Sequence, residues 1–216
     1  MQNEEQRLEV INYIEKASVV LIGLLFILFP LLFTNLTTDF FTLPKQALLI
    51  FVTLALILLF GAKTVLSEKV RIRRTPFDLP VLLFLLAILL SAVFSVSRFD
   101  SFVNFVPLLF AGLSFFAITY NVKDEKSEVV LILSLLTGGA LLSLITVFSY
   151  FKIYVFPFDF TKVQNFTTSG SLLDTGLYLL FLLPLGLYFI TPFIFRKKNK
   201  ETQEEKKMDL TKITGF

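Results

Sequence analysis

The 216-residue sequence contains neither cysteine nor histidine. The first absence excludes disulfides, thiol nucleophiles and thiolate metal ligands, and the second excludes imidazole bases and imidazole ligands. Tryptophan is missing as well, and no glycine-rich loop of the kind that binds nucleotide phosphates is present. The residues themselves therefore predict no catalytic group, no metal site and no cofactor.

Charged residues are also scarce, at 17% of the chain, whereas 55% of the residues are hydrophobic. Soluble domains carry about a quarter charged residues. The mean hydropathy is +0.78, and the apolar residues gather in long uncharged blocks, without the alternation typical of strands. A hydrocarbon core roughly 30 Å thick is spanned by about 20 helical residues. These features predict an all-α integral membrane protein.

The uncharged blocks predict six transmembrane helices. They leave a cytoplasmic N-terminal segment at 1–16 and a charged cytoplasmic tail at 196–216. Nothing in this tail resembles the end of a domain. The tail is therefore a candidate for truncation, and the chain is a candidate for the front part of a longer protein. The predicted spans are 17–35, 46–62, 79–97, 102–120, 129–151 and 176–195.

Positive charge sets the predicted orientation. Loops rich in Lys and Arg stay in the cytoplasm during insertion. With the N-terminus inside, only Lys45, Arg98, Lys152 and Lys162 of the 20 basic residues fall in outer segments. Both termini are therefore expected to be cytoplasmic. The net charge of +3 comes from these inner basic segments, which suit anionic lipid headgroups and not nucleic acid.

The N-terminal segment has two interpretations. Leu8, Ile11 and Ile14 recur at helical spacing, which predicts a short amphipathic helix on the inner leaflet. The alternative is a frayed, solvated tail.

No predicted span contains a charged residue, which argues against an ion-coupled pump. The group Thr137, Gly138 and Gly139 predicts a close contact between helices.

The outer boundary holds the candidate site residues Lys45 and Arg98. Both cations fall at the depth of a lipid headgroup, so a lipid-linked diphosphate could bind them. The alternative is that each side chain only anchors a helix end at the interface. The long outer loop, 157–175, leads into the sixth span with Asp174 near its start, where a carboxylate favours the helix N-terminus.

Residues 39–104 resemble the N-terminal half of the O-antigen ligase family. The resemblance lies in the "LPK" start of the second span, the "RTPFD" start of the third and the serine-rich outer end before the fourth. Weaker similarity covers 169–187, where Ser171 and Leu172 depart from the family's Gly-Asn-rich turn.

The resemblance implies a membrane glycosyltransferase of the bacterial inner membrane, which moves a glycan from undecaprenyl diphosphate at the outer face. In that family the reactive Arg and His residues lie in the second half, so no catalytic residue transfers to this chain. The implied partners are membrane lipids, a polyprenyl-diphosphate-linked glycan, and a missing C-terminal half or companion subunit. The alternatives are a small oligomeric transporter or channel subunit, and a noncatalytic scaffold for envelope-glycan enzymes.

Overall fold

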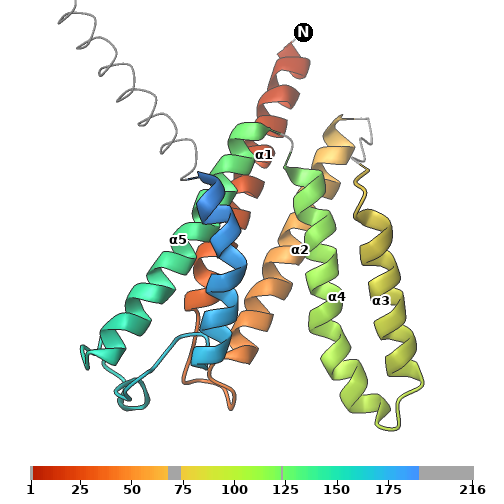
Figure 1. Ribbon diagram of the computed structural model, residues 1–216. Helices are drawn as coiled ribbons and strands as arrows, with labels where there is room; N and C mark the ends of the chain where they lie inside the picture. The colour runs from red at the N-terminus through yellow and green to blue at the C-terminus, as the bar shows by residue number, and fades with distance from the viewer. Residues whose placement is uncertain (1, 68–73, 123, 190–216) are drawn as a thin grey trace, which may run out of the picture.

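The computed structural model describes residues 2–67, 74–122 and 124–189, and these residues are mainly helical (Figure 1). They contain no strand. The last helix, Leu172–Phe189, is the blue one in Figure 1 and is called the final helix below. The elements before it are α1 (Gln2–Leu31), α2 (Thr42–Ser67), α3 (Asp78–Val93), α4 (Arg98–Asn121), α5 (Glu125–Tyr150) and the short helix η1 (Asp159–Thr161).

Five of these helices are long and apolar enough to cross a membrane, and α3 is an apolar helix of 16 residues. At 1.5 Å per residue, α3 measures about 24 Å, which is less than the hydrocarbon core. It is shorter than the predicted span 79–97 because residues 94–97 form the turn into α4. The prediction of an all-α, multi-pass membrane protein is confirmed.

The helix ends differ from the predicted ones mainly on the inner side. Helix α1 begins at Gln2, so the segment 2–16 continues the first span as one helix and is neither a separate surface helix nor a frayed tail. Likewise α2 continues to Ser67, well past the predicted end at residue 62. Charged residues near the inner boundary thus lie on helices. The tail predicted at 196–216 lies outside the described residues.

Successive helices alternate in direction (Figure 1). The N-terminal end of α1 lies at the same face as the start of α3 and the C-terminal end of the final helix. The loops 32–41, 94–97 and 151–171 lie at the opposite face. With the orientation predicted from the basic residues, the first face is the inner one. It follows that α1 and α5 run parallel to each other.

Helix α1 holds the bundle together. It packs against α5 and α2 and also touches α4, whereas α3 contacts only α4 among the labelled helices. The buried core cluster contains residues of α1, α2, α4 and α5 and the C-cap residue of α4. These residues are Ile22, Leu56, Ala117, Leu131 and, at the cap, Val122.

Small residues let α5 approach two helices at once. A Cβ on Gly138 would lie 2.6 Å from the backbone oxygen of Phe26 in α1. A Cβ on Gly139 would collide with the side chain of Leu182 in the final helix. One turn earlier on α5, Ser134 lies against Gly23. The close contact predicted at Gly138 and Gly139 is confirmed, and Ser134 with Gly138 forms the small-xxx-small spacing of membrane helix pairs.

Replacing Gly138 with alanine should destabilise the bundle by about 1–3 kcal/mol, because the new methyl group would meet rigid backbone. Gly139→Ala should cost less, since the Leu182 side chain can change rotamer. Thermal unfolding in micelles, followed by circular dichroism, measures the difference. The control is Gly61→Ala, which meets no atom within 4 Å. Equal melting temperatures for Gly138→Ala and Gly61→Ala would contradict the close α1–α5 contact.

Candidate functional site

The outer end of α2 begins with a carboxylate cap. Asp39 Oδ1 accepts hydrogen bonds from the backbone N–H of Thr42 (2.9 Å) and of Phe41 (3.0 Å). These bonds, with that of Thr42 the largest contribution, lower the pKa of Asp39 below its ordinary value of 3.8. They satisfy N–H groups that the first turn of a helix leaves without a partner. Asp39 therefore fixes the point at which the chain turns into the membrane.

Lys45 lies one turn further into α2 and is partly buried. Its Nζ donates a hydrogen bond to the backbone oxygen of Thr168 at 2.8 Å. The hydroxyl of Thr168, which is fully buried, donates to the backbone oxygen of Pro30 at 2.8 Å. This chain of bonds joins the outer ends of α1 and α2 to the loop before the final helix. The carboxylates of Asp174 and Asp39 also act on Lys45 electrostatically.

A cluster of hydroxyl groups lies beside Thr168. Thr167, Ser169 and Thr175 bond to one another at 2.6–2.7 Å, and Thr167 and Thr175 are buried. Ser171 accepts a bond from the Asp174 N–H at 3.0 Å and donates to its carboxylate at 2.6 Å. Asp174 thus lies in the first turn of the final helix, as predicted, while Ser171 supplies the cap.

Phenylalanines from the two outer loops pack into one aromatic cluster. Their ring centroids lie 4.8–6.5 Å apart, mostly edge to face, which is a favourable geometry for aromatic pairs. Gly170 has a φ of +102°, and a side chain there would press on the ring of Phe41. The cluster consists of Phe33, Phe40, Phe41, Phe156, Phe158, Phe160 and Phe166.

Arg98, the second predicted site residue, lies elsewhere. It is the first residue of α4 and is exposed, at the α3–α4 turn that Figure 1 shows apart from the other outer loops. Within the described ranges, no hydrogen bond or ion pair joins it to Lys45. Ser97 donates to Asp100 and Ser101 donates to Ser95, so the turn is held by its own side chains. Headgroup binding by the two cations remains a prediction.

At the inner boundary, Lys63 is buried inside the bundle. The sequence placed it in the loop after the second span, but α2 continues past it. Its Nζ lies 2.6 Å from Glu15 Oε1 of α1, and the two side chains are 7% and 35% exposed. Sequence patterns did not reveal this pair because both residues lie outside the uncharged blocks. The ion pair compensates for the burial of the ammonium group.

Asn121 joins three helices close to that ion pair. It is 3% exposed at the end of α4. Its Nδ2 donates to the backbone oxygens of Ala117 (2.8 Å) and, more weakly, Leu56 (3.4 Å), while its Oδ1 accepts from the hydroxyl of Ser18 at 3.3 Å. The only sequence signal is a polar residue that directly follows a predicted span, which is common at helix ends.

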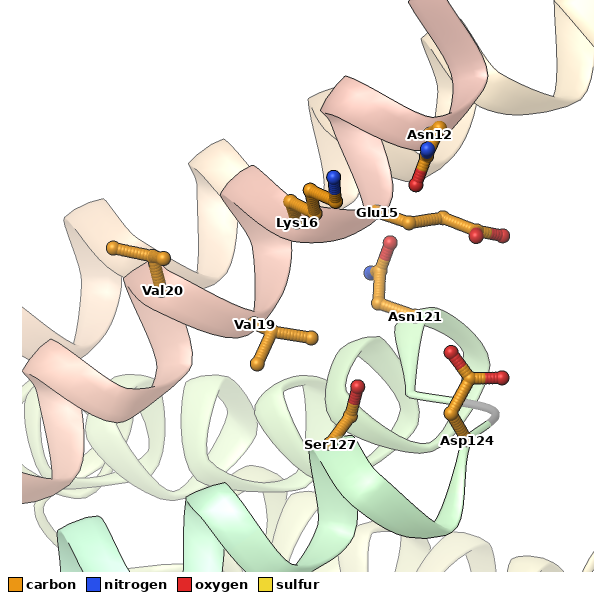
Figure 2. A pocket seen from close by; sticks show the side chains of 8 residues that line it. All are labelled: Asn12, Glu15, Lys16, Val19, Val20, Asn121, Asp124 and Ser127. Atoms are coloured by element: carbon orange, nitrogen blue, oxygen red, sulfur yellow. The ribbon is translucent and has the colours of Figure 1, made fainter. Parts of the chain in front are cut away.

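A pocket of about 400 Å³ opens beside Asn121, between α1 and the turn that joins α4 to α5 (Figure 2). The α1 side chains form one wall, and the opposite wall comes from the end of α4 and the start of α5. Most of the polar groups are at the inner end of the pocket. It is lined by Asn12, Glu15, Lys16, Val19, Val20, Asn121, Asp124 and Ser127.

Comparisons with protein-family models, curated proteins and solved structures give no match to this chain. In the described part of the chain, no group of three or more carboxylates is arranged to hold a metal ion.

Asp39→Ala should lower the melting temperature near neutral pH, because the first turn of α2 loses its cap. The folded pKa of Asp39 is lowered, so its contribution is complete above the ordinary value of 3.8 and is lost as pH falls through the folded pKa. The gap between variant and wild type should therefore close in acid. Melting curves at several pH values test this, and a gap independent of pH would contradict it.

Breaking the Glu15–Lys63 pair should have unequal consequences for the two partners. Glu15→Gln leaves a buried ammonium group without its counter-ion and should cost about 1–3 kcal/mol. Lys63→Met removes the buried charge and leaves a partly exposed carboxylate, so its cost should stay within about 1 kcal/mol. Unfolding in micelles by circular dichroism measures both. Equal losses would show that burial of Lys63 does not control the pair.

Proposed function

We propose that this chain is the N-terminal membrane portion of an O-antigen-ligase-like glycosyltransferase in the bacterial inner membrane. On this proposal it receives a glycan carried on undecaprenyl diphosphate at the outer face and does not catalyse transfer alone. The reactive Arg and His residues would come from a C-terminal half or a companion subunit. The resemblance over residues 39–104 motivates the proposal.

The observation that carries the proposal is the fixed ammonium group of Lys45 at the outer end of α2. Its bond to Thr168 uses one of its three N–H donors, so two remain for phosphate oxygens. The buried hydroxyl of Thr167 lies in the same loop, and that of Thr175 lies in the first turn of the final helix. A lysine held in place loses little side-chain entropy when it binds, which favours recognition of a headgroup.

The motifs that carry the resemblance all lie at helix starts. "LPK" follows the Asp39 cap in the first turn of α2. In "RTPFD", Asp78 at the start of α3 accepts bonds from the backbone and hydroxyl of Thr75. Ser97 and Asp100 form a similar pair at the start of α4. These roles explain the motifs as local structure, so the proposal must be tested by ligand binding.

Lys45→Gln should weaken binding of undecaprenyl diphosphate by about tenfold, because one charge-assisted contact to phosphate is lost. Native mass spectrometry of the purified full chain, titrated with undecaprenyl diphosphate, measures this affinity. Arg98→Gln tests the second predicted contact in the same way. The matched control is Lys152→Gln, an exposed outer lysine.

Undecaprenol, which lacks the diphosphate, should bind equally to wild type and Lys45→Gln. If Lys45→Gln binds undecaprenyl diphosphate as tightly as wild type does, Lys45 is only a helix anchor and the proposal loses its site. Solute uptake or ion conductance by the purified chain in liposomes would then favour the transporter.

A further inference from the structure

The inner pocket follows from the register of the two parallel helices α1 and α5. Gly23 lies against Ser134, and four residues further along each helix Ile27 lies against Gly138. Two turns before the contact of Gly23 with Ser134, the same faces of the two helices carry Lys16 and Ser127, which line the pocket. The small-residue contact thus lies deeper in the membrane than the pocket. A pocket of about 400 Å³ is large enough for a small-molecule group.

The lining changes from polar to apolar along α1. Asn12 and Lys16 lie toward the inner aqueous face, while Val19 and Val20 lie one turn deeper in the membrane. Figure 2 shows these valines at the end of the pocket away from Asn12. A ligand that matches this order has a polar head at the membrane surface and an apolar tail in the inner leaflet.

The charges of the pocket point to the kind of head. Glu15 is neutralised by Lys63. In the part of the chain that the structure describes, the other charged side chains that line the pocket are Lys16 on α1 and Asp124 before α5, on opposite walls. Among the described residues, neither side chain makes a hydrogen bond or ion pair, and Asp124 makes no capping bond to α5. One cation and one anion on opposite walls are complementary to a zwitterion.

We propose that this pocket binds the headgroup of a phosphatidylethanolamine from the inner leaflet. The phosphate lies against Lys16, and the ammonium group lies against Asp124. The side chains of Asn12 and Ser127 have no hydrogen-bond partner among the described residues and can bond the remaining phosphate oxygens. Asn121 is already bonded to Ser18, Leu56 and Ala117. The acyl chains leave the pocket along Val19 and Val20. This site is independent of the outer Lys45 site.

The experiment compares two lipids on the delipidated full chain in micelles. Native mass spectrometry measures binding of dioleoyl phosphatidylethanolamine and dioleoyl phosphatidylglycerol to wild type, Lys16→Gln and Asp124→Asn. Wild type should prefer phosphatidylethanolamine by about tenfold, the effect of one charged hydrogen bond. Asp124→Asn should abolish that preference, whereas Lys16→Gln should weaken binding of both lipids. Lys126→Gln and Asp100→Asn, which lie outside the pocket, are the matched controls.

The proposal is supported if Asp124→Asn loses only the preference for phosphatidylethanolamine. Damage to the fold would instead weaken binding of both lipids equally. Equal binding of the two lipids by wild type overturns it, and so does a preference that survives in Asp124→Asn. A third arm uses glycerophosphoethanolamine, the same head without acyl chains. If this soluble compound displaces the lipid at equal concentration, the ligand is a soluble phosphoester and the lipid proposal fails.

Discussion

The fold depends on the lack of hydrogen-bonding partners inside a bilayer. Every backbone N–H and C=O there must be satisfied within the chain, which helices achieve. Several polar side chains in the described helices obey the same constraint, whereas the buried hydroxyl of Thr53 in α2 has no hydrogen-bond partner among the described residues. Thr64, Ser134, Thr137 and Thr146 each donate to the carbonyl one turn earlier on their own helix. Polar groups that link different helices or loops are therefore concentrated at the two ends of the bundle, near water.

The polar groups at the two ends of the bundle are satisfied by different kinds of interaction. At the outer end, hydroxyls and backbone oxygens around Thr168 join the loops to α1 and α2, and phenylalanines of the same two loops pack against one another. At the inner end, the Glu15–Lys63 ion pair and Asn121 join α1, α2 and α4. The outer end is suited to holding one cation in place, whereas the inner end surrounds a cavity with opposite charges.

The sequence predicted the helices because long apolar blocks need only hydropathy to be recognised, and it predicted the contact at Gly138 from residue size. It could not predict how far α2 continues. A helix can carry Lys63 past the hydrocarbon boundary only if a counter-ion lies opposite, and here that counter-ion is Glu15 of α1. That pairing joins residues far apart in the chain. Lys45 and Arg98 were both expected at the outer face. The sequence could not predict that they lie apart, because their separation also depends on how distant helices pack.

The parallel contact between α1 and α5 has a consequence for biosynthesis. Phe26 and Gly138 touch, yet the three intervening helices must be made before Gly138 emerges. At roughly 5–20 residues per second, the face of α1 that carries Gly23 and Phe26 remains without its α5 partner for on the order of ten seconds. During that interval it is open to other newly inserted helices. The α1–α2 pair, formed earlier, is the first means by which the nascent chain can orient α1 correctly.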